Sequence, residues 1–387
     1  MQDIIYIGEF DFNRKTAAAV RIINNCKAIA ATNNFKIKII GYSDISSFKV
    51  DDLSIFNVKR GKGTLLKLYY YVFRAFHIIH LLNKINEKPD AIIYYGNTAK
   101  ILTALLIYCK FKKIKLIVDV VEWFDYSHLH LGRYGPFALD AHLTMTRLIP
   151  RCDSVIAISS YLQNYYANRG LKTLRIPILV NTKKIDEHPE IISNFDPDFL
   201  NLIYAGNHGK KDLIFNVIDA VEQLSSEGLK VKFHLLGPTK PELQSKIHYP
   251  ITDAIICYGR IPQENVPFYL NQADFSVLLR PVLRYAQAGF PTKFVESLNA
   301  GLPVIANLTS DLNLYLKDGY NGFVLNNYSV NELISKIKSI ISEPKSSYNQ
   351  LRVNAKQTAV ENFDYRIYSK KFDAFLNTNQ KKIFKLN

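Results

Sequence analysis

The stretch GFPTKFVESLNAGLPVIAN, residues 289–307, encodes one turn, one helix and one strand. Its first glycine and proline bend the chain, and Thr292 is then expected to cap a helix that runs to about Asn299. Gly301 should end that helix, because glycine readily adopts the left-handed conformation that follows a helix. The apolar run after Pro303 predicts a buried strand.

The same alternation of strands and helices extends in both directions along the chain. Strands are predicted at residues 3–7, 36–42, 54–59, 90–96, 114–119 and 154–159 of the first half, and at 200–206, 231–237, 254–258, 275–279, 303–306 and 322–325 of the second. Helical patterns separate them, notably at 15–31, 212–227 and 330–342. Several strands are apolar on both faces, as buried parallel strands are. The sequence therefore predicts an α/β protein with two doubly wound, Rossmann-like domains.

Residues 176–199 are the predicted boundary between the two domains, because they carry three prolines, mixed charges and little periodicity. We expect an N-terminal domain over 1–180 and a C-terminal domain over 181–362. A C-terminal helix and tail over 363–387 could pack back on the N-terminal domain. Ligands bind at the carboxyl ends of strands in open parallel sheets, so two domains facing each other should form a ligand-binding cleft.

The charge of the chain is unevenly distributed. Its 387 residues carry 49 Lys and Arg against 34 Asp and Glu, a net charge of +15. Residues 1–180 contain 25 of the basic and 13 of the acidic residues, so most of the excess lies in the first half. This surplus favours a polyanionic partner, such as nucleic acid, anionic lipid or phosphorylated metabolites. The mean hydropathy of −0.04 excludes a polytopic membrane protein.

The cysteines and the N-terminal sequence predict a cytoplasmic protein. Four cysteines are widely spaced without a Cys-x-x-Cys pair, which favours buried free thiols over a disulfide framework or a zinc site. The start, MQDIIYIGEFDFNRK, lacks the features of a signal peptide. Charged residues interrupt the most apolar stretch, residues 65–82, so no transmembrane span is expected.

Two charged residues of the predicted 292–299 helix suggest a ligand site. Lys293 lies in the first turn and Glu296 one turn later, on the same face. The unpaired N–H groups at the start of a helix, together with the lysine, favour a phosphate group. The carboxylate could accept hydrogen bonds from vicinal hydroxyls, such as those of a ribose. Taken alone, such a pair is more often an ordinary ion pair on a helix surface.

The whole stretch resembles the donor-site signature of retaining GT-B-fold glycosyltransferases of the family-4 type, the glycosyl transferases group 1. The signature, P-x-K-x-x-E followed by a small residue and G-x-P-V-I, corresponds here to Pro291, Lys293, Glu296, Ala300, Gly301, Pro303, Val304 and Ile305. Further segments resemble the family in order and spacing: 204–212, 257–281, 317–325 and, more weakly, 151–166. The resemblance implies the GT-B architecture and covers most of the second half.

The resemblance further implies a nucleotide-sugar site in the C-terminal domain. Lys211 and Lys293 would bind the departing diphosphate and Glu296 the ribose, and these three are the expected catalytic residues. Gly206 would let the backbone approach the phosphates closely. The other donor-binding candidates are Asn207, Lys210, Gly259, Arg260, Arg280, Gly289, Phe290, Pro291 and Thr292. Arg280 is equally well explained as a surface arginine.

The chain departs from the family pattern at the first glutamate of the usual E-x7-E pair, which is Ala288 here. The contact from that carboxylate to the donor sugar is therefore missing or replaced. In the mechanism usually proposed for the family, the acceptor hydroxyl attacks the face that the nucleotide leaves, and a phosphate oxygen takes its proton. The protein then mainly positions substrates and stabilises the diphosphate, so no metal or other cofactor is expected.

The acceptor side is expected in the N-terminal domain. The family's N-terminal glycine-rich loop is reduced here to Gly8, and the usual Asp-x-His-Glu lacks its histidine. Glu122, Trp123 and Asp125 follow the predicted 114–119 strand, either as acceptor contacts or as a buried tryptophan with carboxylate partners. The nearby pair His128 and His130 is a weak metal motif because a third ligand is missing.

Basic residues stand beside aromatic and aliphatic ones in residues 59–84 and 110–115. This composition suits a surface that docks on anionic lipid, at about 1 kcal/mol per cation, or else a solvated basic face over a core helix. Lipid-linked acceptors, which are common in the family, favour membrane docking. Nucleic acid is not expected, because no zinc knuckle, RNP-like string or helix-turn-helix pattern is found.

The resemblance thus implies a retaining, metal-independent glycosyltransferase that moves a sugar from a nucleotide-diphosphate sugar to a saccharide or polyprenyl-linked acceptor. Its expected role is the synthesis of a cell-surface polysaccharide (capsule, O-antigen of lipopolysaccharide, or exopolysaccharide) at the inner face of the cell membrane. Two alternatives remain. Ala288 allows a catalytically impaired paralogue that binds nucleotide sugar and acts as a scaffold. A GT-B-fold sugar-nucleotide epimerase would need further acid/base carboxylates that the sequence does not display clearly.

Overall fold

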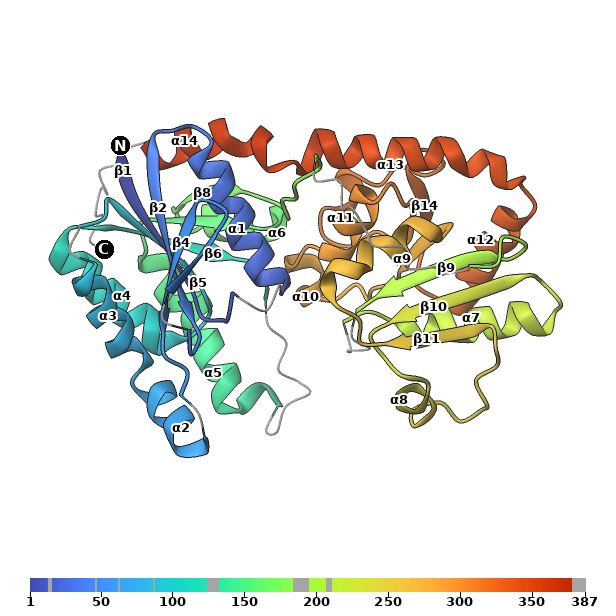
Figure 1. The fold of residues 1–387 in the computed structure, drawn as a ribbon, viewed down its shortest axis with the longest axis horizontal. Helices are drawn as coiled ribbons and strands as arrows, with labels where there is room; N and C mark the ends of the chain where they lie inside the picture. Colours follow the sequence, from blue (N-terminus) through green and yellow to red (C-terminus); the bar gives the residue numbers. More distant parts are fainter. Residues whose placement is uncertain are drawn as a thin grey trace. The chain divides into compact units, whose positions relative to one another are not determined.

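The computed structural model describes residues 1–12, 16–45, 47–61, 63–85, 88–123, 132–183, 195–206 and 211–377. The chain forms two compact units, one of Met1–Leu179 with Tyr365–Asn387 and one of Val180–Asp364. It therefore leaves the first unit after Leu179 and returns to it after Asp364. Each unit is built from a sheet covered by helices (Figure 1).

The first unit contains eight strands: β1 (Gln2–Gly8), β2 (Phe35–Tyr42), β3 (Ser47–Val50), β4 (Leu53–Val58), β5 (Ala91–Tyr95), β6 (Lys115–Val120), β7 (Ser154–Ala157) and β8 (Lys172–Arg175). Their order in the sheet is β3-β4-β2-β1-β5-β6-β7-β8. Neighbouring strands run parallel, except that β3 and β4 are antiparallel. The sequence did not predict β3 and β8, which have only four residues each and no fully buried position.

Seven helices cover the sheet of the first unit in the described residues: α1 (Ala17–Ala30), α2 (Thr64–Val72), α3 (Arg74–Lys84), α4 (Ala99–Lys112), α5 (Pro136–Leu143), α6 (Ser160–Ala167) and α14 (Ser369–Asn377). Helix α1 begins where the Thr16 hydroxyl accepts a hydrogen bond from the backbone of Ala19, as an N-cap residue does. Its Ile22, Cys26 and Ile29 recur at helical spacing and are fully buried against the sheet.

A buried ion pair connects α1 to the sheet and to the end of the first unit. Arg21 Nη2 lies 2.7 Å from Asp119 Oδ1, and both side chains are almost fully buried. The hydroxyl of Tyr6 donates to the same carboxylate at 2.6 Å. Arg21 Nη1 also donates to the carbonyls of Ile176 and Pro177, just before the chain leaves the unit. Asp119 is therefore part of the structural core of the first unit.

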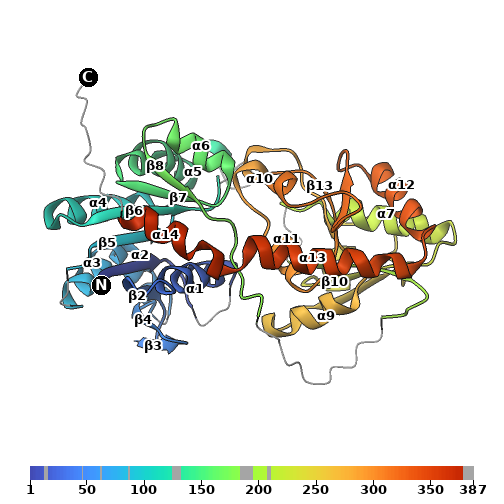
Figure 2. The same cartoon turned by 90° about the horizontal axis from the view of Figure 1, so that it is seen from above.

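Helix α14 packs on the first unit rather than on the second, which precedes it in the sequence (Figures 1 and 2). The ammonium groups of Lys115 and Lys172 donate to main-chain carbonyls of Leu376 and Phe375, at 3.0 and 2.6 Å. These bonds satisfy carbonyls of the last helical turn, which lack partners within the helix. The predicted tail beyond residue 377 lies outside the described residues.

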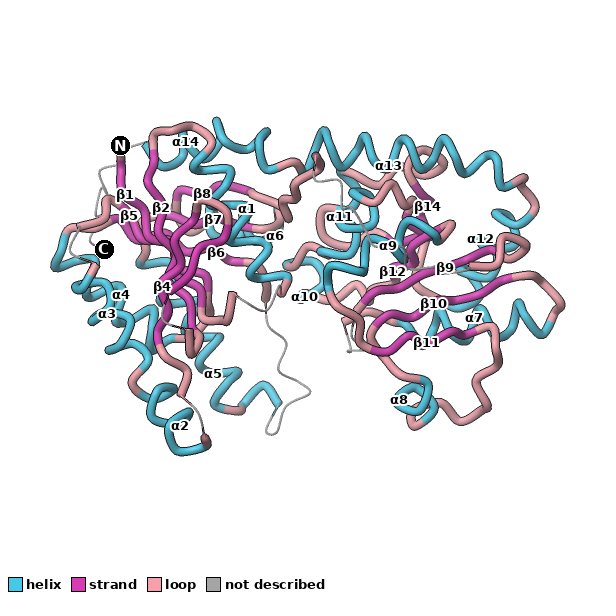
Figure 3. The backbone as a smooth tube through the Cα atoms, viewed as in Figure 1, coloured by secondary structure: helices cyan, strands magenta, loops and turns pink. Residues whose placement is uncertain are grey.

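The second unit contains six parallel strands: β9 (Leu200–Ala205), β10 (Val231–Leu236), β11 (Ile255–Gly259), β12 (Phe275–Leu278), β13 (Val304–Asn307) and β14 (Gly322–Leu325). Their order is β11-β10-β9-β12-β13-β14. The described helices are α7 (Ile214–Ser226), α8 (Lys240–Gln244), α9 (Val266–Gln272), α10 (Arg284–Ala288), α11 (Thr292–Asn299), α12 (Val330–Ile341) and α13 (Tyr348–Phe363). Figure 3 shows the strands as one layer between helices.

Successive residues of β9 point to opposite faces of this sheet, as the strand period requires. Leu202 and Tyr204 pack with α7 and α12 in the larger apolar cluster. Ile203 packs on the other face with Leu270 of α9. Because both faces are buried, the strands lack polar alternation, which explains why they were readable as continuous apolar runs.

Both sheets reverse their strand order at one place, between β1 and β5 in the first unit and between β9 and β12 in the second. Neighbouring loops leave such a switch point in opposite directions, so a crevice opens at the carboxyl ends of the two strands. Within the described ranges, no helix combines the length and apolar composition needed to cross a bilayer.

Candidate functional site

The predicted turn–helix–strand unit forms as expected around α11, with one correction. Helix α11 spans Thr292–Asn299, but Pro291 is its N-cap and no side chain caps it. Thr292 is instead the first helical residue. The proline already holds the extended conformation of an N-cap, so the helix begins one residue earlier than a threonine cap requires. Gly301 follows the helix in the left-handed conformation, with φ of +68°.

Charged residues from three segments meet at the β9/β12 switch point. Lys293 Nζ of α11 donates to Asp212 Oδ2 at 2.8 Å. The hydroxyl of Tyr204, in β9, donates to the same oxygen at 2.8 Å. Arg280 Nε, which follows β12, lies 3.4 Å from the other oxygen, Asp212 Oδ1. One carboxylate, just before α7, thus connects a lysine, an arginine and a tyrosine.

The electrostatics of this cluster follow from its burial. Burial alone raises the pKa of Asp212, but Lys293 and Arg280 outweigh it and hold that pKa below its ordinary value. Burial, with the negative charge of Asp212, raises the pKa of Tyr204, so the tyrosine stays protonated and donates. Asp212 is therefore ionised at neutral pH and neutralises only part of the surrounding positive charge.

Arg280 is a buried residue and not the surface arginine that the sequence left as an alternative. It is only 6% exposed. Asn307, at the end of β13, holds its main chain by two hydrogen bonds, accepting from Arg280 N at 2.9 Å and donating to Arg280 O at 2.8 Å. Within the part of the chain that the structure describes, the side-chain Nε is buried without a hydrogen-bond partner. A buried guanidinium with unused donor capacity is suited to an anionic ligand.

Gly206 lies directly against Lys293. It has φ of +151°, and a Cβ built there would lie 2.4 Å from Lys293 Cε. Any other residue at this position would displace the lysine or the end of β9, which explains the glycine. That a phosphate approaches the backbone at Gly206 stays a prediction.

Lys211 also belongs to this cluster. The residue as a whole is exposed, yet its ammonium group is close enough to the cluster for burial and the positive charge of Arg280 to lower its pKa. The candidates Asn207 and Lys210 lie outside the described residues. Together, Lys211, Arg280 and Lys293 supply three cations, with Asp212 as their partial counter-ion.

Glu296 lies one helical turn beyond Lys293. Partial burial raises its pKa to about 7, although the positive charge of Lys293 opposes the shift. Gln263 Nε2 is 3.4 Å from Glu296 Oε1. Gln263 follows β11, whose end carries two further candidates, Gly259 in the left-handed conformation and the exposed Arg260. The structure thus connects the β11 end to Glu296 through a neighbouring side chain.

The remaining candidates in this segment are buried and have a packing role. The ring of Phe290 is buried, and its centroid lies 5.7 Å from that of Tyr315 and 6.0 Å from that of Phe363. A ligand could therefore meet Phe290 only through its main chain. Gly289 and Pro291 are also buried. Ala288, at the position of the absent family glutamate, is fully buried at the end of α10.

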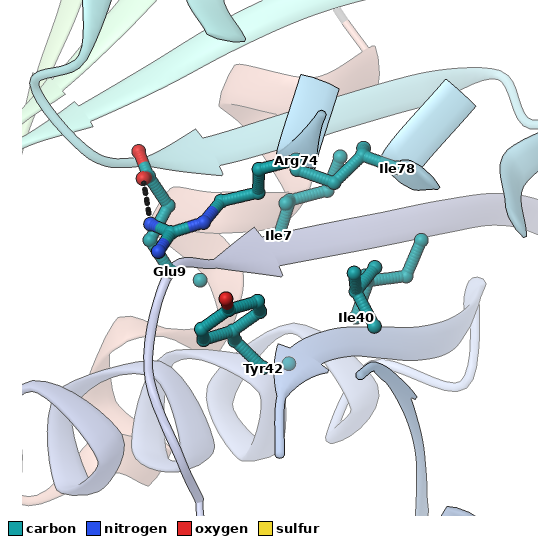
Figure 4. Close-up of a pocket in the computed structure, with 9 residues that line it drawn as sticks. Ile7, Glu9, Ile40, Tyr42, Arg74 and Ile78 are labelled. Carbon is teal, nitrogen blue, oxygen red and sulfur yellow. Dashed lines mark hydrogen bonds and ion pairs between the residues drawn. The ribbon is translucent and has the colours of Figure 1, made fainter. Parts of the chain in front are cut away.

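A second cluster lies at the β1/β5 switch point of the first unit (Figure 4). Glu9, next to Gly8, accepts hydrogen bonds from Arg74 Nη1 at 2.9 Å, from the Thr98 hydroxyl at 3.2 Å and from the Tyr94 hydroxyl. The guanidinium carbon of Arg74 lies 4.1 Å from the ring centroid of Tyr42. Among the residues that the structure describes, Arg74 Nε is buried and has no hydrogen-bond partner. A small pocket opens here, lined by Ile7, Gly8, Glu9, Ile40, Gly41, Tyr42, Val58, Arg74 and Ile78.

The other acceptor-side candidates follow β6. Trp123 packs edge-to-face on Tyr165 of α6, with ring centroids 4.8 Å apart. Glu122 and Trp123 are both partly buried. Asp125, His128 and His130 lie outside the described residues. Trp123 thus has a packing role.

Several functional candidates were missed by the sequence analysis. They are Tyr204, Asp212 and Asn307 in the second unit, and Glu9, Tyr42, Arg74 and Tyr94 in the first. Glu9 and Asn307 follow predicted strands and Tyr42 ends one. Tyr94 and Tyr204 lie within predicted strands, whereas Asp212 and Arg74 lie at the start of helical segments. The position at or after the end of a parallel strand was therefore a usable signal for three of these residues. Which of these residues meet depends on strand order, which the sequence did not specify.

Three comparisons with known proteins show which proteins this chain is similar to. Residues 187–358 match the family model of glycosyl transferases group 1. A Klebsiella pneumoniae protein named only for its place in a cps region is 24% identical over 233 residues, covering 58% of each chain. A Salmonella typhimurium protein, named as the colanic acid biosynthesis glycosyltransferase WcaL, is 21% identical over 185 residues, covering 46% of this chain and 45% of its own. These alignments span about half the length of either relative.

The structure of HepE from Anabaena, in complex with UDP and glucose, superimposes with a TM-score of 0.68 at 16% identity, covering 97% of this chain and 99% of HepE. Likeness at this identity establishes the fold. The chain has the GT-B fold, and its residues 187–358 are similar to the family of glycosyl transferases group 1.

Proposed function

We propose that this protein transfers a sugar from a nucleoside diphosphate sugar to a saccharide or polyprenyl-linked acceptor. The observation that carries this proposal is the cluster of Lys211, Arg280 and Lys293 at the β9/β12 switch point of a unit that is similar to glycosyl transferases group 1. Three cations around one carboxylate leave a net positive site where a diphosphate is expected to bind. HepE, which shares the fold, was crystallised with UDP and with UDP-glucose.

In this proposal, Lys293 and Arg280 hold the diphosphate, and the first N–H groups of α11 face the same charge. Glu296, one turn later, accepts hydrogen bonds from the ribose hydroxyls. The acceptor hydroxyl attacks from the side that the diphosphate leaves, which retains the anomeric configuration, and a phosphate oxygen takes the proton. The cations stabilise the charge that develops on the leaving group, without a metal ion.

The acceptor is assigned to the β1/β5 switch point of the first unit. The carboxylate of Glu9 and the guanidinium of Arg74 can bind sugar hydroxyls, and a small, partly apolar pocket lies beside them. The names of the two bacterial relatives, one in a cps region and one for colanic acid, support a role in the synthesis of a cell-surface polysaccharide.

A donor screen tests the proposed activity. The purified protein is incubated with UDP-, GDP-, ADP- and dTDP-sugars, with and without polyprenyl-phosphosaccharide acceptors, and released nucleoside diphosphate is measured. Release that requires an acceptor supports the transferase. Tight donor binding without turnover would favour a scaffold, and release of isomerised sugar nucleotide would favour an epimerase.

We expect the affinity for a nucleotide sugar to fall as the pH decreases below about 7. Only the ionised form of Glu296 accepts two hydrogen bonds, and its pKa is raised to about 7 by burial. Since each pH unit below the pKa reduces the ionised fraction about tenfold, the dissociation constant should rise roughly tenfold from pH 8 to pH 6. Calorimetry with UDP-glucose measures the dissociation constant at each pH. Glu296→Gln should bind the nucleotide sugar weakly, and its dissociation constant should not change with pH. If the dissociation constant of this variant rises with decreasing pH as it does in the unmodified protein, the assignment of Glu296 as the ribose ligand is wrong.

The proposal also includes docking on anionic membrane at the inner face of the cell membrane. Helices α2 and α3 expose an unusual set of large apolar side chains: Leu65, Leu66, Tyr69, Tyr71, Val72, Phe73 and Phe76. Phe111 of the neighbouring α4 is 83% exposed. Exposed lysines accompany them, including Lys67, Lys110 and Lys113. Apolar side chains that insert beside cations that attract lipid phosphates are typical of an interfacial surface.

Replacing Leu65 and Phe76 by serine should reduce binding to vesicles of phosphatidylcholine and phosphatidylglycerol by about tenfold or more, because two inserting side chains lose their transfer free energy. Leu65 is 83% and Phe76 67% exposed, so the fold should be unaffected. Flotation measures the bound fraction. The matched control is Val353→Ser with Val360→Ser, on exposed positions of α13. Absence of flotation by the unmodified protein at low salt would refute docking.

A further inference from the structure

Asp212 has a position that the diphosphate assignment does not explain. A carboxylate among the cations of a site lowers the attraction of that site for a polyanion, and yet Asp212 contacts Lys293 at 2.8 Å and Arg280 at 3.4 Å. Its side chain is only 10% exposed. A third contact, from the Tyr204 hydroxyl, fixes its orientation. An ionised and nearly buried carboxylate in such a place repels any phosphate that binds to the same cations.

The nucleotide sugar and the nucleoside diphosphate that remains after transfer differ in their negative charge. In a nucleotide sugar, each phosphate is bonded to a sugar on one side and to the other phosphate on the other side. The diphosphate therefore carries two negative charges. The nucleoside diphosphate that remains after transfer has a free terminal phosphate, whose second ionisation occurs at about pH 6, and so carries nearly three. Asp212 removes one unit of charge from the cations of the cluster, and its repulsion acts more strongly on the second ligand than on the first.

We propose that Asp212 is a built-in counter-ion that sets the charge of the phosphate site, so that the site accepts a nucleotide sugar and releases the more highly charged nucleoside diphosphate. This inference rests on the proposed donor site and concerns how that site discriminates between the donor and the product nucleoside diphosphate. Asp212 acts through Lys293 and Arg280, so it is a positioning residue. It has a second effect before the donor arrives, because it holds both cations in place while no phosphate is bound.

The neighbouring contacts support a role in tuning the charge rather than in maintaining the fold. Leu213, next to Asp212, donates its N–H to the carbonyl of Leu279, so the main chain of this loop is fixed independently of the carboxylate. Asn307 likewise holds the main chain of Arg280 without help from Asp212. Loss of the carboxylate charge should therefore leave the main chain of this loop and of Arg280 in place.

The test is the variant Asp212→Asn, which keeps the shape and removes the charge. Calorimetry is performed with UDP and UDP-glucose, or with GDP and GDP-mannose if the protein prefers guanine. We expect the variant to bind UDP about tenfold more tightly and UDP-glucose about threefold more tightly, because repulsion grows with ligand charge. Inhibition by UDP should become stronger by the same factor. Asp212→Glu, which keeps the charge, should bind UDP less tightly than Asp212→Asn does.

A matched control is Glu227→Gln, because Glu227 caps the other end of α7 and pairs with Lys338 at 2.6 Å. It should leave both affinities unchanged. Equal or weaker binding of UDP by a folded Asp212→Asn variant overturns the inference and leaves the proposed function standing, since a purely structural role predicts loss for both ligands. Failure of the unmodified protein to bind any nucleoside diphosphate removes the proposed function and this inference together.

Discussion

Replacing Lys293 by alanine should lower the affinity for the donor roughly 30-fold, about 2 kcal/mol, which is typical of a lost charge-assisted hydrogen bond. The lysine is 29% exposed in its side chain and faces Asp212 and Gly206 at the carboxyl ends of the sheet. Its loss leaves Asp212 with Tyr204 and Arg280 as partners, so the unit should remain folded. Calorimetry with the preferred nucleotide sugar measures the affinity, and thermal unfolding checks the fold.

Two further variants test whether the loss of donor affinity comes from the charge and the position of Lys293. Lys293→Arg keeps the positive charge and should recover part of the affinity, although its planar group fits the Gly206 contact less well. Lys338→Ala removes an exposed lysine on α12 that pairs with Glu227, and should have no effect on binding. Unchanged donor affinity in Lys293→Ala together with Glu296→Ala would mean that the donor does not bind at α11.

The largest loss of stability is expected for Asp119→Ala. Without this carboxylate, Arg21 remains charged and almost fully buried without its ion-pair partner, which costs about 3–5 kcal/mol. The variant also removes the acceptor of the Tyr6 hydroxyl. Urea denaturation followed by circular dichroism measures the free energy of unfolding, and we expect the transition of the first unit to move to lower urea.

The apolar double variant Arg21→Met with Asp119→Leu provides the decisive comparison. It removes both charges at once and should recover most of the lost stability, because no buried charge is left unpaired. Asp198→Ala, which removes an exposed carboxylate 3.7 Å from Lys230, should leave the unfolding transition unchanged. A small effect of Asp119→Ala alone would show that the network around Arg21 does not hold the first unit together.

Much of the fold could be predicted from the sequence because buried parallel strands consist of uninterrupted runs of apolar residues. The strands predicted at 231–237 and 322–325 form as β10 and β14, within one residue at each end. The short strands β3 and β8 were missed because four partly exposed residues carry no such run. Thr292 was misplaced as a cap because local preference favours threonine there, whereas the preceding proline already supplies the cap conformation.

The candidate site was only partly predictable for a different reason. Lys293 and Glu296 could be paired from the sequence, since a helix fixes the direction of side chains one turn apart. Asp212 and Arg280 stand 68 positions apart and meet only because β9 and β12 are neighbours in the sheet. Glu9 and Arg74 meet in the same manner at the β1 end. Contacts between distant segments depend on strand order, which local patterns do not encode.

The stretch 289–307 by itself determined that this chain contains a helix followed by a buried strand, with Lys293 and Glu296 on one helical face. Only the tertiary structure decided that Asp212 lies between Lys293 and Arg280, and that Arg280 is buried rather than exposed. The reason is physical. Periodicity records which side of an element faces the core, whereas the charge around a residue is set by segments that packing brings to it from elsewhere in the chain.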